Sequence, residues 1–145
     1  MRVVVQRVKS AFVMVDEKTV GEIKSGMVVF LGMKEGDGEK EALYLINKLV
    51  HMRIFSDEND KMNLSLKDVN GEILVVSQFT LYGELSGRRP SFTNALNAAL
   101  AKPLYEKFIF ELQKEIEIVQ SGVFQAKMEV SLINDGPVTF VIDAP

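Results

Sequence analysis

A turn-forming segment near the C-terminus, Asn134-Asp135-Gly136-Pro137-Val138-Thr139, constrains the fold of this chain more than any other feature. On both sides of it, over residues 125–133 and 138–142, hydrophobic side chains alternate as they do in half-buried β-strands. Asn, Asp and Gly tolerate left-handed backbone, and Pro lacks a backbone donor. The local sequence therefore predicts a hairpin turn between two antiparallel strands. The alternative is that the Gly136-Pro137 backbone is itself a recognition surface.

The N-terminal third has the pattern of several short strands. Polar segments at residues 16–18 and 24–26 separate the apolar stretches, which predicts an antiparallel meander. The stretch from Val28 to Leu31 is apolar on both faces, so we expect it at the centre of a sheet. The predicted strands span residues 2–8, 11–15, 19–23 and 27–31.

Two segments carry hydrophobic residues at helical spacing and predict amphipathic helices over residues 38–51 and 103–115. Asp37 is the expected N-cap of the first helix. A separate short helix is expected over residues 95–101. The break falls at Pro103, because the residue before a Pro disfavours the α region and Pro is tolerated in a first turn.

The middle of the chain predicts further strands, including an apolar, β-branched and therefore buried strand over residues 72–76. The preceding Asp68-Val69-Asn70-Gly71 segment is a strong hairpin signal. Other short strands are expected at residues 52–55, 61–66 and 117–120. The whole pattern predicts one α+β domain over residues 1–145. We expect mostly antiparallel strands in two sheets or a partly closed barrel, with two long helices packed on one side.

Composition excludes several kinds of site. The chain has no Cys, so it forms no disulfide, thiolate nucleophile or thiolate metal site. The one His, His51, is expected at the end of the first long helix in a structural role, and the polar loop at residues 56–61 lacks the ligand spacing of a calcium loop. We therefore predict no metal ion and no cofactor. The N-terminus lacks the layout of a signal peptide and no apolar run approaches about 20 residues, which fits a cytoplasmic protein.

The net charge of −3 argues against binding along a nucleic-acid backbone, because proteins that do so usually present a basic surface. A nucleic-acid partner would be held locally, by its end. Arg88 and Arg89 are the only adjacent basic pair. They are either a solvated pair or a local contact to such a partner.

A second candidate for chemistry is Ser77-Gln78-Phe79-Thr80, at the end of the predicted buried strand. Hydroxyls, an amide and free backbone N–H groups gathered there could bind a developing oxyanion. The alternative is that Ser77 and Thr80 only cap backbone groups. A serine-hydrolase triad is not expected, because His51 has no evident partner.

Ser77-Gln78-Phe79-Thr80-Leu81 and the segment from Asn134 to Thr139 resemble the two motifs of the D-aminoacyl-tRNA deacylases, formerly called D-tyrosyl-tRNA deacylases. The resemblance runs along the whole chain and is highly specific when its pieces are taken in order. One departure is Gln125, where the family usually has Gly. Further matching segments are Arg2-Val3-Val4-Val5-Gln6-Arg7-Val8, Arg53-Ile54-Phe55, Lys61-Met62-Asn63-Leu64-Ser65, Arg88-Arg89-Pro90-Ser91-Phe92 and Leu104-Tyr105-Glu106.

The resemblance implies a homodimeric hydrolase that cleaves the ester between a D-amino acid and the 3′-terminal adenosine of tRNA, a chiral proofreading step in translation. It also implies that the Gly136-Pro137 peptide is cis and enters the partner's active site. The implied catalytic residues are Ser77, Gln78, Phe79 and Thr80. The implied substrate-binding residues are Gly136, Pro137, Val138 and Thr139, with Arg88 and Arg89 near the RNA.

A wall of backbone at Gly136-Pro137 offers a physical account of chiral selection. At a D-configured Cα, hydrogen and side chain exchange places relative to an L residue, so the wall can admit the hydrogen and clash with an L side chain. Glycine escapes this clash, which makes glycyl-tRNA a candidate second substrate.

Two mechanisms fit the resemblance. In the first, the 2′-hydroxyl of the terminal adenosine assists hydrolysis, since it is already next to the ester, while the protein stabilises the oxyanion. In the second, Thr80 is the nucleophile. Thr needs an adjacent base and the sequence offers none, so we favour the first mechanism. A non-catalytic binder of the tRNA acceptor end and a purely structural oligomer are the remaining alternatives.

Overall fold

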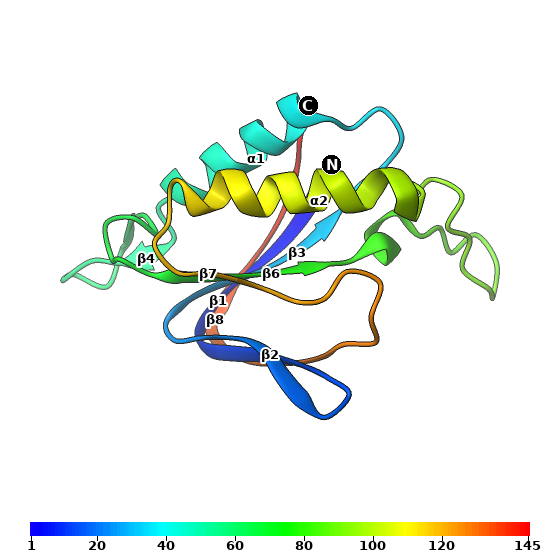
Figure 1. Ribbon diagram of the computed structural model, residues 1–145. Helices are drawn as coiled ribbons and strands as arrows, with labels where there is room; N and C mark the ends of the chain where they lie inside the picture. Colours follow the sequence, from blue (N-terminus) through cyan, green and yellow to red (C-terminus); the bar gives the residue numbers. More distant parts are fainter.

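The computed structural model describes residues 1–145 and contains one large curved sheet, a small two-stranded sheet and two α-helices (Figure 1). The helices are α1 (Glu39–His51) and α2 (Ala98–Gln113). A short 3₁₀ helix, η1 (Phe79–Tyr82), follows strand β6. The strands are β1 (Arg2–Val15), β2 (Lys18–Ile23), β3 (Gly26–Gly32), β4 (Phe55–Ser56), β5 (Met62–Leu64), β6 (Glu72–Ser77), β7 (Val119–Ser121) and β8 (Glu129–Asp143).

The large sheet is mixed and nearly closes into a barrel. Its order is β2-β1-β3-β6-β7, and β8 also pairs with β1. β1 is antiparallel to β2, β3 and β8, whereas β6 is parallel to both β3 and β7. The two end strands approach each other, since a Cβ added at Gly21 in β2 would lie 2.8 Å from the Ser121 carbonyl oxygen in β7. The predicted α+β class with a partly closed barrel is confirmed, and the parallel pairs are an addition to it.

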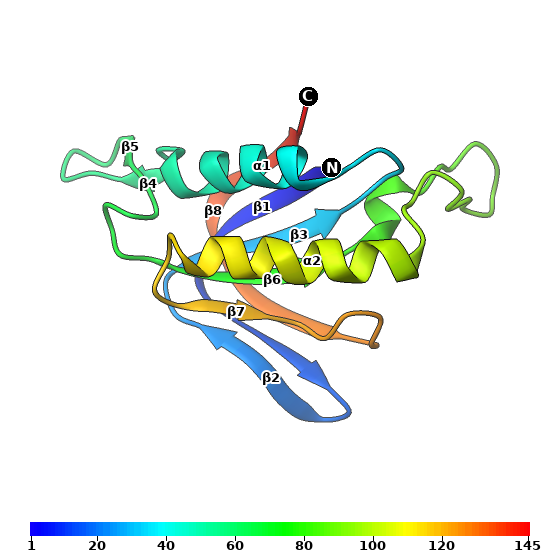
Figure 2. The same ribbon diagram turned by 45° about the horizontal axis from the view of Figure 1, so that its top comes forward.

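Both helices lie side by side on one face of the sheet, and the chain termini meet near α1 (Figure 2). The Ala144 N–H donates to the Met1 carbonyl at 2.9 Å. A large core forms between helices and sheet, and a smaller one lies inside the curve of the barrel. Neither helix is long and apolar enough to span a membrane. The α1 residues buried in the large core are the predicted ones: Ala42, Leu45, Ile46, Leu49 and Val50.

The predicted break before the second long helix is wrong. α2 is continuous from Ala98 to Gln113 with Pro103 inside it, and the Asn97 side chain caps its start by accepting from Leu100 N–H at 3.1 Å. Pro103 forfeits one backbone hydrogen bond, and burial of Phe108 and Leu112 on the same helix offsets that loss.

Asp37 is not the N-cap of α1, which is Gly38. The Asp37 carboxylate instead accepts from the Lys34 N–H at 2.8 Å and pairs with the amino group of Met1. His51 does end α1, where its Nδ1 lies 3.0 Å from the Asn47 carbonyl oxygen.

The predicted strands do form strands, but some of them pair with other partners than predicted. Residues 2–15 form one strand, and β2 and β3 both pair with it and not with each other, so there is no meander. The central position of β3 is confirmed. The hairpin predicted at Asn70-Gly71 is wrong, because β5 pairs with β4 while β6 joins β3 in parallel. Asn70 still has the left-handed φ of 50° that the turn signal anticipates. The strands expected at residues 52–55 and 117–120 lie slightly later, as β4 and β7.

The C-terminal hairpin prediction is also wrong, since β8 runs unbroken through the Asn-Asp-Gly-Pro segment. Pairing with β1 on both sides of the segment keeps the strand continuous. Gln6 pairs with Thr139 and Val8 pairs with Asn134, so residues 135–138 stand opposite the single residue Arg7. The segment is an enlarged bulge in a long strand pair, with four residues opposite one, and not a chain reversal.

Candidate active site

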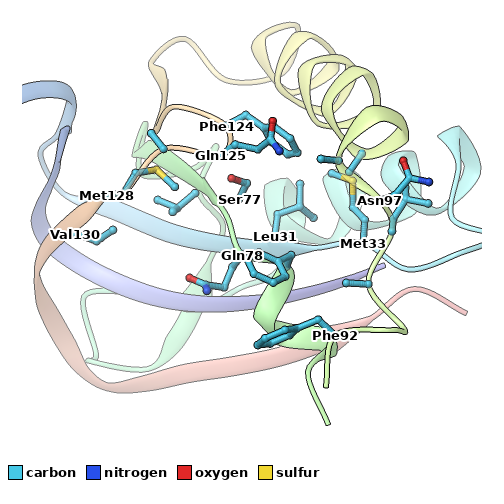
Figure 3. A pocket seen from close by; sticks show the side chains of 17 residues that line it. Leu31, Met33, Ser77, Gln78, Phe92, Asn97, Phe124, Gln125, Met128 and Val130 are labelled. Atoms are coloured by element: carbon cyan, nitrogen blue, oxygen red, sulfur yellow. The ribbon is translucent and has the colours of Figure 1, made fainter. Parts of the chain in front are cut away.

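A cavity of about 670 Å³ opens between the ends of β3 and β6, the start of α2 and the chain that leads into β8 (Figure 3). That size is typical of a small-molecule site. Met128 and Val130 lie at one end of the cavity, and Met33 and Asn97 lie at the other. Its 17 lining residues are Leu31, Met33, Val76, Ser77, Gln78, Phe79, Phe92, Ala95, Leu96, Asn97, Ala98, Ala101, Phe124, Gln125, Ala126, Met128 and Val130.

The floor of the cavity is built where β6 ends and η1 begins. Gln78 N–H donates to the Leu31 carbonyl at 2.8 Å, which keeps the chain on the edge of β3 for one residue more. η1 then folds over Gly32, where an added Cβ would lie 2.9 Å from Leu81 Cβ and 3.1 Å from the Gln78 carbonyl oxygen. Glycine at position 32 therefore lets the turn pack close against β3.

Three of the four predicted catalytic residues line this cavity. They are Ser77, Gln78 and Phe79. Thr80 does not line it, and its hydroxyl accepts a hydrogen bond from the Gln78 amide. As the first residues of a helix, Phe79 and Thr80 have backbone N–H groups without a partner inside that helix. The arrangement offers a hydroxyl, an amide and backbone donors beside an apolar space.

Two aromatic side chains stand at the mouth of the cavity. Phe79 and Phe92 meet edge to face with ring centroids 5.0 Å apart, and Phe79 remains 57% exposed. Apolar rings left in solvent at a cavity mouth are suited to contact a ligand with a flat apolar face.

The segment from Phe124 to Ala126 forms the wall nearest α2. Phe124 packs against Tyr105, with ring centroids 5.6 Å apart. The Tyr105 hydroxyl donates to the Val75 carbonyl at 3.0 Å, and burial raises the pKa of Tyr105 to about 12. Tyr105 thus ties α2 to strand β6. Sequence reasoning did not identify Met33, Asn97 or Phe124 as site residues, because no local motif marks them.

None of the 17 lining residues carries an ionisable side chain. The chain also has no group of three or more His, Asp or Glu side chains placed to hold a metal ion. His51 lies at the end of α1 and is not a lining residue. The cavity therefore supplies hydrogen-bond donors and acceptors but no side-chain general base.

The second predicted motif, from Asn134 to Thr139, forms the bulge in β8, and contacts with β1 hold it in place. The Asn134 amide donates to the carbonyls of Arg7 at 2.8 Å and of Val138 at 3.2 Å, across the base of the bulge. Arg7, which is 8% exposed, donates from Nε to the Asp135 carbonyl at 3.1 Å and from Nη1 to the Ile54 carbonyl at 2.6 Å. The bulge is thus fixed by side chains at both ends.

The Gly136-Pro137 peptide at the tip of this bulge is cis, and both residues are exposed. They face a second cavity of about 510 Å³, bordered by Arg7 and by the β4–β5 hairpin. Val138 is buried in the large core, and the Thr139 hydroxyl accepts from the Gln6 amide at 3.1 Å. Neither Gly136 nor Pro137 lines the first cavity, so one chain does not bring the two motifs together.

Arg88 and Arg89 are exposed in the loop between η1 and α2, which projects from one end of the molecule in both views (Figures 1 and 2). Neither forms an ion pair. Their charges are free for a partner, and the same loop continues to Phe92 at the cavity mouth.

Comparison with known proteins finds relatives that align with nearly the whole chain. Residues 4–143 match the family model described as D-Tyr-tRNA(Tyr) deacylase. Curated relatives named D-aminoacyl-tRNA deacylase include those of Syntrophus aciditrophicus, 52% identical, and Clostridium tetani, 55% identical; each alignment covers 99% of this chain and 97% of the relative. A solved structure titled c-Myc DNA Unwinding Element Binding Protein is 38% identical, with a TM-score of 0.95 over 100% of this chain and 99% of that one. A probable eukaryotic D-amino acid tRNA deacylase shares the fold, with 19% identity and a TM-score of 0.84 over 98% of both chains.

Proposed function

The chain belongs to the D-Tyr-tRNA(Tyr) deacylase family and is a hydrolase acting on D-aminoacyl-tRNA, and from that premise we propose how its two motifs divide the work. The Ser77–Thr80 segment holds the ester that links the amino acid to the 3′-terminal adenosine. The Gly136-Pro137 backbone selects the configuration of the amino acid. The single observation that carries this proposal is a mostly apolar cavity that has hydrogen-bonding groups at the end of β6 and no ionisable side chain.

The cavity is suited to the nucleoside end of the substrate. If the backbone forms the selector, the selector touches only the substituents on the substrate Cα. The side chains of different D-amino acids then need open space and not a fitted pocket. The terminal adenosine is the same in every charged tRNA. An apolar cavity with aromatic rings at its mouth and three side-chain amides, on Gln78, Asn97 and Gln125, matches a flat base with a polar edge.

We propose that the selector comes from the partner subunit of a homodimer. Gly136 and Pro137 are exposed and lie outside the cavity of their own chain. The strand that carries them, β8, pairs only with β1, so its other edge has no partner strand. β8 also exposes Ile133 to 58% and Val141 to 63%. An open edge with exposed apolar side chains is a surface on which a second chain can dock.

In this arrangement the Gly136-Pro137 backbone faces the substrate Cα. It leaves room for hydrogen where a D residue presents hydrogen, and it clashes with the side chain that an L residue would place there. Glycine has hydrogen at both positions and is not rejected by this contact. Glycyl-tRNA is therefore a candidate second substrate.

Hydrolysis is proposed to use the 2′-hydroxyl of the terminal adenosine. That group is already beside the ester, so proximity supplies much of the acceleration. Ser77, Gln78 and the backbone N–H groups of Phe79 and Thr80 orient the ester and stabilise its oxyanion. The alternative with Thr80 as nucleophile is disfavoured by position, because its hydroxyl is not among the groups lining the cavity and has no base beside it.

Arg88 and Arg89 are proposed to contact phosphates near the acceptor end. The net charge of −3 is consistent with a partner held by its end and does not favour binding along duplex DNA. We also propose a cytoplasmic location, because translation consumes charged tRNA there.

The test is to incubate the protein with D-tyrosyl-tRNA and L-tyrosyl-tRNA and to follow loss of each ester. Selective loss of the D ester supports the proposal. Tight binding of both without hydrolysis would identify a non-catalytic acceptor-end binder. No binding to either would leave only a structural role.

A further inference from the structure

Gln125 has a backbone conformation that favours glycine. Its φ is 66°, in the left-handed region where an L side chain is disfavoured. Gln125 and the other non-glycine residues with positive φ, Asp16, Glu17, Asp60 and Asn70, all lie in exposed turns or bends. Gln125 is the one that lines the large cavity. A strained position at a ligand cavity is a reason to ask what the side chain does there.

The Gln125 amide is unused within the protein. It makes no side-chain hydrogen bond, whereas the Gln78 amide is engaged with Thr80 and the Asn97 carbonyl oxygen caps α2. Figure 3 shows Gln125 beside Phe124 on the wall nearest α2. A primary amide carries a donor NH₂ group and an acceptor oxygen side by side. It therefore offers both to a ligand in a cavity that is otherwise mostly apolar.

Adenine presents the matching pair of groups. The N6 amino group of adenine donates and its N7 accepts, and a side-chain amide pairs with both at once. Phe79 and Phe92 supply the apolar contacts that a flat base needs at the cavity mouth. The amide thus complements the edge of the one base that every substrate of this enzyme shares.

We propose that Gln125 is a specificity-determining residue whose amide pairs with the N6 and N7 edge of the 3′-terminal adenine. This rests on the proposed function, in which the cavity holds the terminal adenosine. The contact strengthens binding of the acceptor end and takes no part in the chemical step. It also gives a reason for a side chain at a backbone position where glycine would relieve strain.

The test compares D-tyrosyl-tRNA ending in adenosine with the same tRNA ending in purine riboside, which lacks the 6-amino group. For the wild type we expect KM to rise about tenfold on the purine riboside substrate, with kcat within about twofold. Gln125→Gly should show the raised KM on adenosine already, and no further rise on purine riboside. Its melting temperature should equal or exceed that of the wild type, since the left-handed backbone is relieved.

Glu17→Gly is the matched control. Glu17 has nearly the same φ, 63°, and is exposed in the β1–β2 turn away from the cavity. It should change the melting temperature in the same direction as Gln125→Gly and leave both KM values at the wild-type level. Equal KM values for wild type and Gln125→Gly on adenosine, or an unchanged dependence on the 6-amino group in Gln125→Gly, would overturn the inference. Absence of D-ester hydrolysis by the wild type would instead overturn the proposed function.

Discussion

Arg7 and Asp135 are 128 residues apart in sequence, and the Arg7 guanidinium holds the main chain at Asp135 with a 3.1 Å hydrogen bond to its carbonyl oxygen. The Asp135 carboxylate lies 3.1 Å from the same nitrogen. Asp135 immediately precedes Gly136, so Arg7 fixes one end of the proposed selector. Because Arg7 also donates to Ile54, it locks the bulge to the rest of the fold.

Arg7→Met should therefore destabilise the protein and loosen its chiral selection. It leaves the Ile54 and Asp135 carbonyls without their donor, at a cost of about 2–4 kcal/mol in the free energy of unfolding. The ratio of D-tyrosyl to L-tyrosyl ester hydrolysis should fall. Asp135→Asn is the control, because it keeps the carbonyl contact and removes only a partly exposed ion pair worth about 1 kcal/mol or less. Urea unfolding and the two ester assays measure both effects; an unchanged ratio in Arg7→Met would show that this anchor does not support selection.

Thr80→Ala tests the chemical step. With the RNA hydroxyl as the assisting group, kcat should fall by less than about tenfold, because Thr80 contributes a backbone N–H that alanine retains. Loss of a true nucleophile would cost on the order of 10⁴-fold or more. The complementary substrate is D-tyrosyl-tRNA with a 2′-deoxy terminal adenosine. We expect it to be hydrolysed very slowly, and a full rate on it would contradict the RNA-assisted mechanism.

Gly32→Ala tests whether the close packing of η1 positions the site. The added methyl would lie 2.9 Å from Leu81 Cβ, so η1 has to move away from β3. We expect a loss of roughly 1–3 kcal/mol in stability and at least about a tenfold fall in kcat, since small displacements of positioned groups are costly. Gly87→Ala has open space around it and should change neither quantity. Thermal unfolding and single-turnover kinetics would reveal the difference, and wild-type kcat in Gly32→Ala would refute the positioning role.

Tyr105 makes stability sensitive to alkaline pH. Burial raises the pKa of its phenol to about 12, whereas in the unfolded chain it ionises near 10. Between pH 10 and pH 12 the folded state binds more protons than the unfolded state. The free energy of unfolding therefore keeps its full value below about pH 10 and falls above it, by up to about 2–3 kcal/mol. Tyr105→Phe should reduce the slope of unfolding free energy against pH above 10. Part of the slope should remain, because desolvation also raises the pKa of Tyr82 to about 12. An identical slope in the variant would contradict this assignment.

The sequence predicted those features that depend on local pattern. The spacing of Leu45, Ile46 and Leu49 identified α1 and its buried face, and the apolar run in β3 identified a central strand. The polar end of β6 was recognised as a candidate site at Ser77 and Gln78, and the structure places both in the cavity. In each case neighbouring residues contain the information.

Features that depend on contacts between segments far apart in the sequence could not be predicted from local pattern. Asn-Asp-Gly-Pro has the composition of a reversing turn, yet β1 pairs on both sides of it and converts it into a bulge. Pro103 marks a helix start locally, yet the core contacts of α2 keep the helix continuous. Met33, Asn97 and Phe124 come from three separate segments and meet only in the folded cavity.

The proposed cross-subunit selector can be tested with mixed dimers. One chain carries Ser77→Ala and Gln78→Ala, which disable its cavity, and the other carries Gly136→Ala. The methyl added at Gly136 would lie 2.8 Å from the Asn134 side-chain oxygen, so the amide that closes the bulge is displaced and the selector should admit L esters. The Gly136→Ala homodimer should therefore hydrolyse L-tyrosyl-tRNA. In the mixed dimer the only working cavity faces an intact selector from its partner.

The decisive measurement is the rate of L-tyrosyl-tRNA hydrolysis by this purified mixed dimer, made by co-expression with two different tags, relative to its rate on D-tyrosyl-tRNA. Our account predicts that the mixed dimer regains wild-type discrimination, with D hydrolysis at about half the wild-type rate and L hydrolysis near background. If the mixed dimer hydrolyses the L ester as fast per working cavity as the Gly136→Ala homodimer does, the selector acts within its own chain and the account is contradicted.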